Sequence, residues 1–170
     1  MASLRHRLML EEGQRRFRDA QRLGQSNLED PFSDSAHLLS LLGFELLLKL
    51  VFELTTRNPA PQHHKYNEMF NALPTETRSE AVTFARTRVG PTAFAIPIED
   101  ILKDWSTNFV SVRYPYERYS KMTEQQYAER SKSWAESGGP LDEADVRYYP
   151  EELFGMVEAL LHLAKRLNRN

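Results

Sequence analysis

The stretch "AHLLSLLGFELLLKLVFEL", from Ala36 to Leu54, is the longest apolar run of the chain and decides its fold. A transmembrane helix needs about 20 mostly apolar residues, so the length alone would allow a membrane span. However, Glu45, Lys49 and Glu53 interrupt the run at a spacing of four, which places them along one side of a helix. Because a charge at the middle of a bilayer costs about 2.5–3.5 kcal/mol, the run predicts the central helix of a soluble protein.

The same run predicts the surroundings of that helix. The helix is apolar around most of its circumference, so other helices must cover it. Ser33 or Asp34 is the predicted N-cap, because a side-chain oxygen there can accept a hydrogen bond from a free backbone N–H. Pro59 and Pro61 in "NPAP" end the helix near Thr56, since proline cannot continue it.

Periodic apolar residues predict further helices before and after this one. They cover residues 3–23, 65–73, 76–88, 98–114, 123–137 and 151–167. Strand signals are weak, with short β pairing conceivable only around Arg113 and Arg147. The chain therefore predicts an all-α fold, a bundle of long helices in a single domain over residues 1–170.

A change of composition predicts a polar insertion before the C-terminal helix. Apolar residues become sparse between Glu117 and Tyr149, so the insertion covers about residues 118–149. Within it, Thr123 and Gln126 form a capping-box pattern that starts a polar helix. Gly138 supplies the stop of that helix.

Charge and cysteine content exclude several classes of function. The 170 residues have a net charge of −2, too small for a global field that attracts nucleic acid. The absence of cysteine excludes disulfides, thiolate catalysis and cysteine-based zinc sites, and fits the reducing cytoplasm. The beginning, "MASLRHRLML", has no sustained apolar core, so we expect no signal peptide.

The first 24 residues form a mildly basic segment. Six arginines stand against Glu11, Glu12 and Asp19, which gives this segment a charge of +3. We interpret it as a solvated face rather than an RNA-binding face, because nucleic-acid footprints are usually more concentrated.

Two similar phrases border the insertion, "VRYPYE" at residues 112–117 and "VRYYPEE" at residues 146–152. One interpretation is a structural clasp, in which Arg113 is held by a backbone carbonyl or by Glu45 or Glu117, and Tyr114 is largely buried. The other is a surface of arginine and tyrosine that grips the phosphate and base of a nucleotide. The clasp is favoured, and Arg147 is expected in more exposed surroundings than Arg113.

Three phrases taken together resemble the HEPN superfamily (higher eukaryotes and prokaryotes nucleotide-binding). They are "GFELLLK" at residues 43–49, "HKYNEMFNALP" at residues 64–74 and "FVSVRYPYE" at residues 109–117. The resemblance rests on their order and spacing and covers roughly residues 33–167. It implies an up-and-down helical bundle that forms a homodimer, in a prokaryotic toxin–antitoxin or defence setting.

The resemblance implies two kinds of activity. Many such proteins are metal-independent endoribonucleases that carry an Arg, a polar residue and, a few residues later, a His. In "RNPAPQHH" this pattern is matched by Arg57 with His63 or His64. A histidine can transfer a proton near neutral pH, and an arginine can hold the phosphate. Other members bind nucleotides, RNA or proteins without cleavage, with Arg113, Tyr114, Glu117, Glu45 and Lys49 as the candidate binding residues here.

The remaining candidate sites favour structural roles. Glu45 and Lys49, one turn apart, are interpreted as an ion pair on a mostly buried helix. Adjacent imidazoles rarely reach one ion, so His63 and His64 predict no metal site. His37 is interpreted as a hydrogen-bonded core or boundary residue. The sequence contains no glycine-rich phosphate loop, so it predicts no cofactor. The leading hypothesis is an interaction or nucleotide-binding module; a ribonuclease and a structural subunit without ligand are the alternatives.

Overall fold

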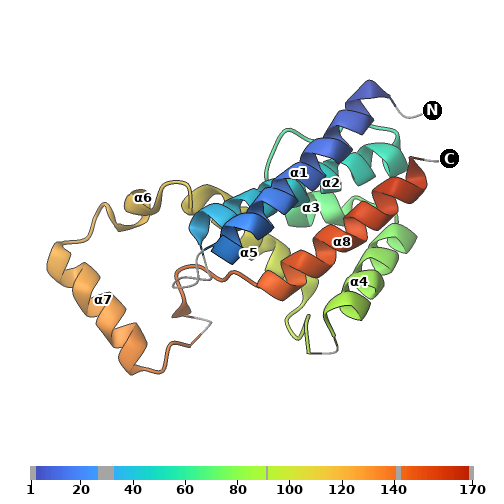
Figure 1. Ribbon diagram of the computed structural model, residues 1–170. Helices are drawn as coiled ribbons and strands as arrows, with labels where there is room; N and C mark the ends of the chain where they lie inside the picture. The colour runs from blue at the N-terminus through green and yellow to red at the C-terminus, as the bar shows by residue number, and fades with distance from the viewer. Residues whose placement is uncertain (1–2, 27–32, 91, 141–142, 169–170) are drawn as a thin grey trace.

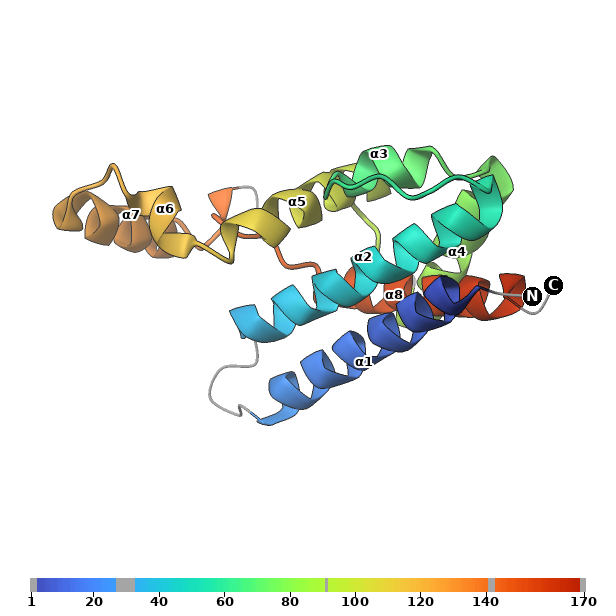
Figure 2. The ribbon, with the colours of Figure 1, turned by 90° about the horizontal axis from the view of Figure 1, so that it is seen from above.

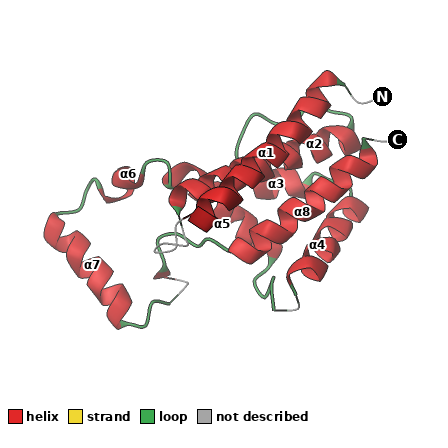
Figure 3. Ribbon diagram, in the orientation of Figure 1, coloured by secondary structure: helices red, strands yellow, loops and turns green. Residues whose placement is uncertain are grey.

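A computed structural model describes residues 3–26, 33–90, 92–140 and 143–168. These residues contain helices and loops and no strand (Figure 3). The helices are α1 (Leu4–Ser26), α2 (Asp34–Thr56), α3 (Tyr66–Asn71), α4 (Thr75–Val89), α5 (Ile98–Ser111), α6 (Pro115–Tyr119), α7 (Glu124–Glu136) and α8 (Pro150–Leu167). The all-α prediction is confirmed for the described part of the chain.

Helix α2 is the centre of the bundle. Ser33 caps its N-terminus by accepting a hydrogen bond from the backbone N–H of Ala36, as the sequence predicts. Residues along its whole length are buried, so α1, α3, α5 and α8 can all pack against it (Figure 2). No helix of the described residues combines the length and the apolar character that crossing a membrane requires.

Two glycines bring α1 unusually close to α2. A Cβ atom on Gly43 would lie 3.0 Å from the carbonyl oxygen of Gly13, and a Cβ on Gly13 would lie 2.8 Å from Cγ of Leu47. A Cβ on Gly13 would force Leu47 to move, and a Cβ on Gly43 would press on the backbone of α1, so the two glycines permit the close approach of this antiparallel helix pair (Figure 2).

The core has two parts that meet at α2. Helix α8 packs against both α2 and α4, and Arg166 of α8 forms a 2.6 Å ion pair with Glu80 of α4. On the other side, Phe44 of α2 lies edge-on to Tyr66 and to Trp105 of α5, with ring centroids 5.3 and 5.1 Å away. These aromatic rings join α2, α3 and α5 into one apolar unit.

The predicted insertion forms an arm that projects from the bundle. The arm comprises residues 113–149 and leaves the end of the bundle opposite the chain termini (Figure 1). None of its described residues is buried before Tyr149, and every residue of α7 is exposed. The capping box of Thr123 and Gln126 is present as predicted, and α7 ends just before Gly138.

Several helix ends differ from the predicted ones. Helix α5 stops at Ser111 rather than at residue 114, and α6 was not predicted because five residues are too few for a periodic signal. Helix α1 ends at Ser26, three residues beyond its predicted end at residue 23. Residues 27–32, between α1 and α2, lie outside the described part of the chain.

Candidate functional site

A buried carboxylate on α2 organises the best-defined polar site. Oxygen Oε1 of Glu45 accepts a 2.7 Å hydrogen bond from Nζ of Lys49. Oxygen Oε2 lies 2.8 Å from Nδ1 of His64 and accepts a 3.0 Å hydrogen bond from the hydroxyl of Tyr66. Because a buried carboxylate is costly unless both oxygens have partners, these three groups make the position tolerable. The predicted Glu45–Lys49 ion pair is confirmed.

The loop that carries His64 is held on α2 at two points. After α2 ends, the chain turns back along the helix (Figure 2). The backbone N–H of Ala60 donates a 3.2 Å hydrogen bond to Glu53, and four residues later His64 reaches Glu45. Glu53 and Glu45 thus fix both the path of the loop and the orientation of the His64 ring.

The negative charge of Glu53 is balanced mainly by side chains of α1. Arg5 donates two hydrogen bonds to its carboxylate, at 3.1 and 2.8 Å, and Nε2 of His6 lies 3.2 Å away. The hydrogen bonds from Arg5 lower the pKa of Glu53, and the N–H of Ala60 acts in the same direction while burial opposes it. The charged residues at a spacing of four on α2 therefore belong to two separate polar sites, one around Glu45 with Lys49 and one around Glu53.

Phe109 of α5 brings a second cation to the Glu45 site. The ring of His64 lies 4.7 Å from the ring of Phe109, and Cζ of Arg113 lies 4.1 Å from the same ring centroid. Arg113 is fixed by a 2.8 Å hydrogen bond from its Nε to the backbone carbonyl of Phe109. We call Glu45, Lys49, His64, Tyr66, Phe109 and Arg113 the Glu45 cluster.

Tyr66 links the cluster to α5 and stays protonated. Its backbone N–H donates a 2.9 Å hydrogen bond to Oγ of Ser106. Burial raises the pKa of the Tyr66 hydroxyl, and the charge and hydrogen bond of Glu45 raise it further, against a small opposing effect of Arg113. At neutral pH this hydroxyl is a fixed hydrogen-bond donor to Glu45, not a source of protons.

The arrangement presents one histidine nitrogen outward. The side chain of His64 is 45% exposed, whereas that of Glu45 is 6% exposed. Since Nδ1 faces the carboxylate, Nε2 is the nitrogen left to meet a ligand or to transfer a proton. Arg113, exposed and packed on the same aromatic ring, can add a charge-assisted hydrogen bond to an anion. Such a site suits a phosphate group.

Four of the predicted site residues come together here and four do not. The cluster contains Glu45, Lys49, His64 and Arg113. Arg57 is the C-cap of α2, in the left-handed conformation with φ of 62°. It follows Glu45 by twelve positions, about 18 Å along the helix axis, so a single chain does not bring Arg57 beside His64.

The other three predicted residues lie at the edge of the cluster or beyond it. Nδ1 of His63 accepts a 3.2 Å hydrogen bond from the backbone N–H of Lys65, and its Nε2 lies 3.9 Å from Glu68. Tyr114 is 45% exposed, so its expected burial is wrong. Glu117 is also exposed, at the start of the arm. The chain turns into α6 at Pro115, which carries both side chains away from the core.

The clasp interpretation fits the second Arg-Tyr phrase better than the first. Arg147 lies 3.3 Å from a carboxylate oxygen of Asp104, and the hydroxyl of Tyr149 donates to the same oxygen at 2.9 Å. Nitrogen Nδ2 of Asn108 donates a 2.7 Å hydrogen bond to the carbonyl of Arg147. The expectation that Arg147 has the more exposed surroundings is wrong, because the returning chain lies along α5 whereas Arg113 projects from its end.

Sequence reasoning missed Tyr66 and Phe109 as members of the site. Both stand inside the phrases that carry the family resemblance, but their spacing marked them only as apolar positions of helices. Their roles depend on contacts between α2, α3 and α5, which no local pattern encodes.

His37 borders a cavity where the arm rejoins the bundle. Its ring lies edge-on to Tyr148 at 4.7 Å, and its Nε2 has no hydrogen-bond partner among the described residues. Burial lowers the pKa of His37 to about 4, although the charge of Asp34 opposes this effect. The adjacent cavity of about 190 Å³ is bordered by Phe17, Ser40 and Phe154. The burial of His37 agrees with the prediction of a core or boundary residue, but its Nε2 lacks the hydrogen bond that this prediction included.

Among the described residues, no group of three or more histidine, aspartate or glutamate side chains is placed to hold a metal ion. Comparisons with models of protein families, with curated proteins and with solved structures found no match.

Proposed function

We propose that this chain is a HEPN-like binding module that takes a phosphate of RNA or of a nucleotide at the Glu45 cluster. One observation supports this proposal above the others. The three phrases behind the resemblance are far apart in the chain, yet each contributes to the same site: Glu45 from the first, His64 from the second and Arg113 from the third. Such convergence favours a shared role over three unrelated packing positions.

The chemistry of the site supports an anionic ligand. Arg113 and the outward Nε2 of His64 are both hydrogen-bond donors when His64 is protonated, and Lys49 adds positive charge beneath them. Glu45 is already engaged by three partners and lies below the surface, so its charge repels a ligand less than a free carboxylate would. An arginine stacked on an aromatic ring is also pre-oriented, which reduces the entropy lost on binding.

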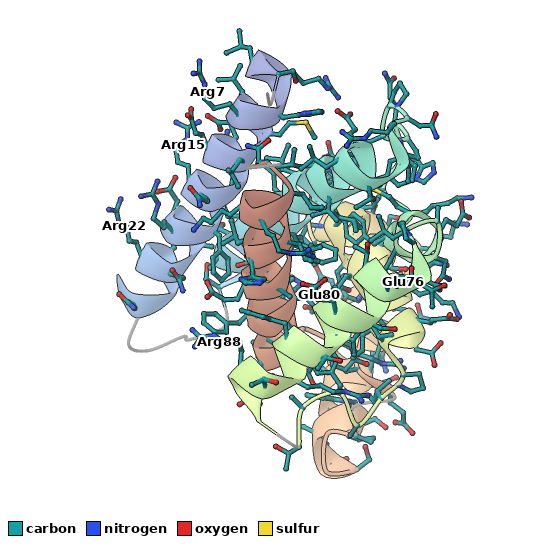
Figure 4. The ribbon with its side chains drawn as sticks, turned by 90° about the vertical axis from the view of Figure 1, so that its right-hand side faces the viewer. Arg7, Arg15, Arg22, Glu76, Glu80 and Arg88 are labelled. Atoms are coloured by element: carbon teal, nitrogen blue, oxygen red, sulfur yellow. The ribbon has the colours of Figure 1, made fainter. Side chains whose placement is uncertain are left out.

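A binding measurement tests the proposal. Fluorescence anisotropy with a labelled single-stranded RNA, and a parallel titration with ATP, should show saturable binding in the presence of a chelator. Each of Arg113→Ala and His64→Ala should weaken binding by about tenfold, the value of a lost charge-assisted hydrogen bond. Arg88→Ala removes a cation from α4, away from the site, and serves as the matched control (Figure 4). Equal affinity of the Arg113 and Arg88 variants, or no binding of either ligand, would overturn the proposal in favour of a structural subunit.

A second candidate function is metal-independent cleavage of RNA. It is favoured by the carboxylate of Glu45 at Nδ1 of His64, an arrangement that fixes the orientation of the ring and leaves Nε2 facing outward. In this reaction Nε2 would accept the proton of a 2′-hydroxyl, whose oxygen attacks the phosphorus while the 5′-oxygen leaves and takes a proton from water. Arg113 would stabilise the charge that develops on the phosphate.

The cleavage hypothesis predicts different results for variants of Arg113 and of Arg57. Cleavage in chelator should disappear in His64→Ala and Arg113→Ala, and persist in His63→Ala and Arg57→Ala. Loss in Arg57→Ala instead would identify the pair that the family resemblance implies, acting between two chains. Binding without cleavage in the parent protein would leave the binding module as the function.

A further inference from the structure

A cavity lies between α4, the end of α3 and the start of α5. Helix α4 packs mainly on α8, at the side of the bundle (Figure 1). The space that remains between α4 and the other two helices is a cavity of about 420 Å³. Small-molecule sites commonly measure about 300–1,000 Å³, so this cavity has room for a ligand of the size of a metabolite. None of its described lining residues belongs to the Glu45 cluster.

The inner wall of the cavity is apolar and elongated. Phe70 of α3 is buried there, and Val82 of α4 and Ile98 of α5 pack half-buried against the core. Thr75 and Thr83 also border the cavity, and the eight positions between them correspond to about 12 Å along the axis of α4. The apolar body of a ligand can therefore lie along this wall.

Arg78 brings a cation to the cavity that no carboxylate of the described chain neutralises. Its guanidinium donates a 3.4 Å hydrogen bond to Oδ1 of Asn71 and a 3.2 Å hydrogen bond to Oγ1 of Thr75, both neutral acceptors that border the same cavity. Its Nε is buried without a hydrogen-bond partner among the described residues. Because a guanidinium has five N–H donors, the Nη groups keep donors for a ligand while the two bonds hold them in place.

Glu99 brings one negative charge to the same cavity. It stands exposed in the first turn of α5 and has no ion pair among the described residues, whereas its neighbour Asp100 is paired with Lys103 at 3.1 Å. Glu99 and Arg78 are the ionisable groups of the described lining, and they form no ion pair with each other. Two separate opposite charges over an apolar wall are complementary to a zwitterion rather than to a simple anion.

We propose that this cavity binds a small zwitterion with an apolar body, either a free amino acid with an apolar side chain or a short peptide of such residues. The ligand carboxylate accepts hydrogen bonds from the Nη groups of Arg78, and the ligand ammonium group donates to Glu99. The apolar side chain of the ligand covers Phe70, Val82 and Ile98. A phosphate or a dicarboxylate is disfavoured, because it lacks the cationic group and adds negative charge near Glu99.

Isothermal titration calorimetry with matched ligands tests the proposal. L-phenylalanine and the dipeptide L-phenylalanyl-L-phenylalanine carry both charges at different separations. The analogue 3-phenylpropionate lacks the ammonium group, and 2-phenylethylamine lacks the carboxylate. At least one zwitterion should bind the parent protein saturably, and both analogues should bind about tenfold more weakly, the value of a lost charge-assisted hydrogen bond. The tighter of the two zwitterions shows whether the ligand is a free amino acid or a peptide.

Two variants assign the binding to the named charges. Arg78→Gln should weaken the zwitterion and 3-phenylpropionate alike, by about tenfold, whereas Glu99→Gln should weaken the zwitterion and leave 3-phenylpropionate unchanged. Arg78→Lys keeps the charge but not the planar fork, so its affinity should lie between those of the parent and Arg78→Gln. Arg86→Gln on α4 and Glu151→Gln in the first turn of α8 are matched controls, because both side chains are exposed and neither borders the cavity.

Several results would overturn the proposal. One is a parent protein that binds neither zwitterion up to the solubility limit of the ligand. Another is equal affinity for the zwitterion and for one of its single-charge analogues, and a third is binding that Arg78→Gln and Glu99→Gln leave unchanged. His64→Ala and Arg113→Ala should not alter this binding. A loss in those two variants would assign the zwitterion to the Glu45 cluster, while failure at this cavity leaves the function proposed for that cluster untouched.

Discussion

Helix α2 of the bundle and helix α7 of the arm have similar N-terminal capping signals but differ in how many of their residues are buried. Helix α2 has a side-chain N-cap and α7 has a complete capping box, so both begin with strong local signals. Helix α2 then buries most of its apolar residues, whereas α7 buries none. Capping therefore specifies where a helix starts, while burial decides how much its residues contribute to stability.

The bundle and the arm also differ in the burial of a carboxylate that each of them contains. Glu45 in the bundle and Asp145 in the arm each collect several donors. The side chain of Glu45 is 6% exposed and that of Asp145 is 29% exposed. Similar hydrogen-bond patterns therefore carry different energies, because solvent reaches the carboxylate of Asp145 more than that of Glu45.

The largest expected effect is the introduction of charge into the core. Leu47→Asp, at a position with no exposed surface, should cost more than about 5 kcal/mol and unfold the protein, since it adds an unpaired buried charge to the loss of apolar burial. Ala128→Asp on α7 should change the unfolding free energy by less than about 0.5 kcal/mol. Urea denaturation followed by circular dichroism measures both. A large effect of Ala128→Asp would show that α7 is packed after all.

The next effect compares the two carboxylate centres directly. Glu45→Ala leaves Lys49 and Tyr66 without their partner and should cost about 3–5 kcal/mol, as for a broken buried pair. Asp145→Ala should cost at most about 1 kcal/mol, because its partners can turn to water. Thermal unfolding of both variants and of the parent protein measures the two losses of stability. Similar losses would contradict the assigned difference in burial.

A pH effect is expected at the junction of the two regions. The pKa of His37 is lowered from 6.5 to about 4, so the unfolded state binds the proton more readily. The contribution of neutral His37 to the free energy of unfolding is therefore fully present above pH 6.5 and is lost as the pH falls toward 4. About 2 kcal/mol of it is lost by pH 5. Urea denaturation at pH 7.5 and 5 measures the loss. His37→Gln should remove this part of the pH dependence, and an unchanged slope in that variant would assign it to other groups.

The smallest effect compares the two arginines that border the arm. Arg147→Ala breaks a half-buried contact with Asp104 and should cost about 1 kcal/mol, or roughly 2–4 °C in Tm. Arg113→Ala should cost less, since that side chain is exposed and bonded to one backbone carbonyl. Differential scanning calorimetry orders the two variants. A larger loss for Arg113→Ala would restore the clasp interpretation of the first phrase.

Local patterns were sufficient for the helices but not for the site. The apolar run of residues 36–54 predicted a covered central helix, and Ser33, Thr123 and Gln126 marked helix starts that the structure confirms. Those signals act over a few residues, where hydrogen bonds and side-chain entropy depend on near neighbours. The burial of Tyr114 was predicted wrongly because the direction of the chain after Pro115 depends on distant contacts of the arm.

What the sequence alone determined is the all-α class, the central position of α2, the ion pair of Glu45 with Lys49 and the polar character of residues 118–149. Only the tertiary structure decided that His64 and Arg113 meet over Phe109 and that the polar segment projects as an arm. The physical reason is the range of the interactions. Helix periodicity and caps are short-range, whereas the cluster brings Glu45 together with His64 and Arg113, which follow it by 19 and 68 positions. Their proximity follows from how the helices bury their apolar faces together.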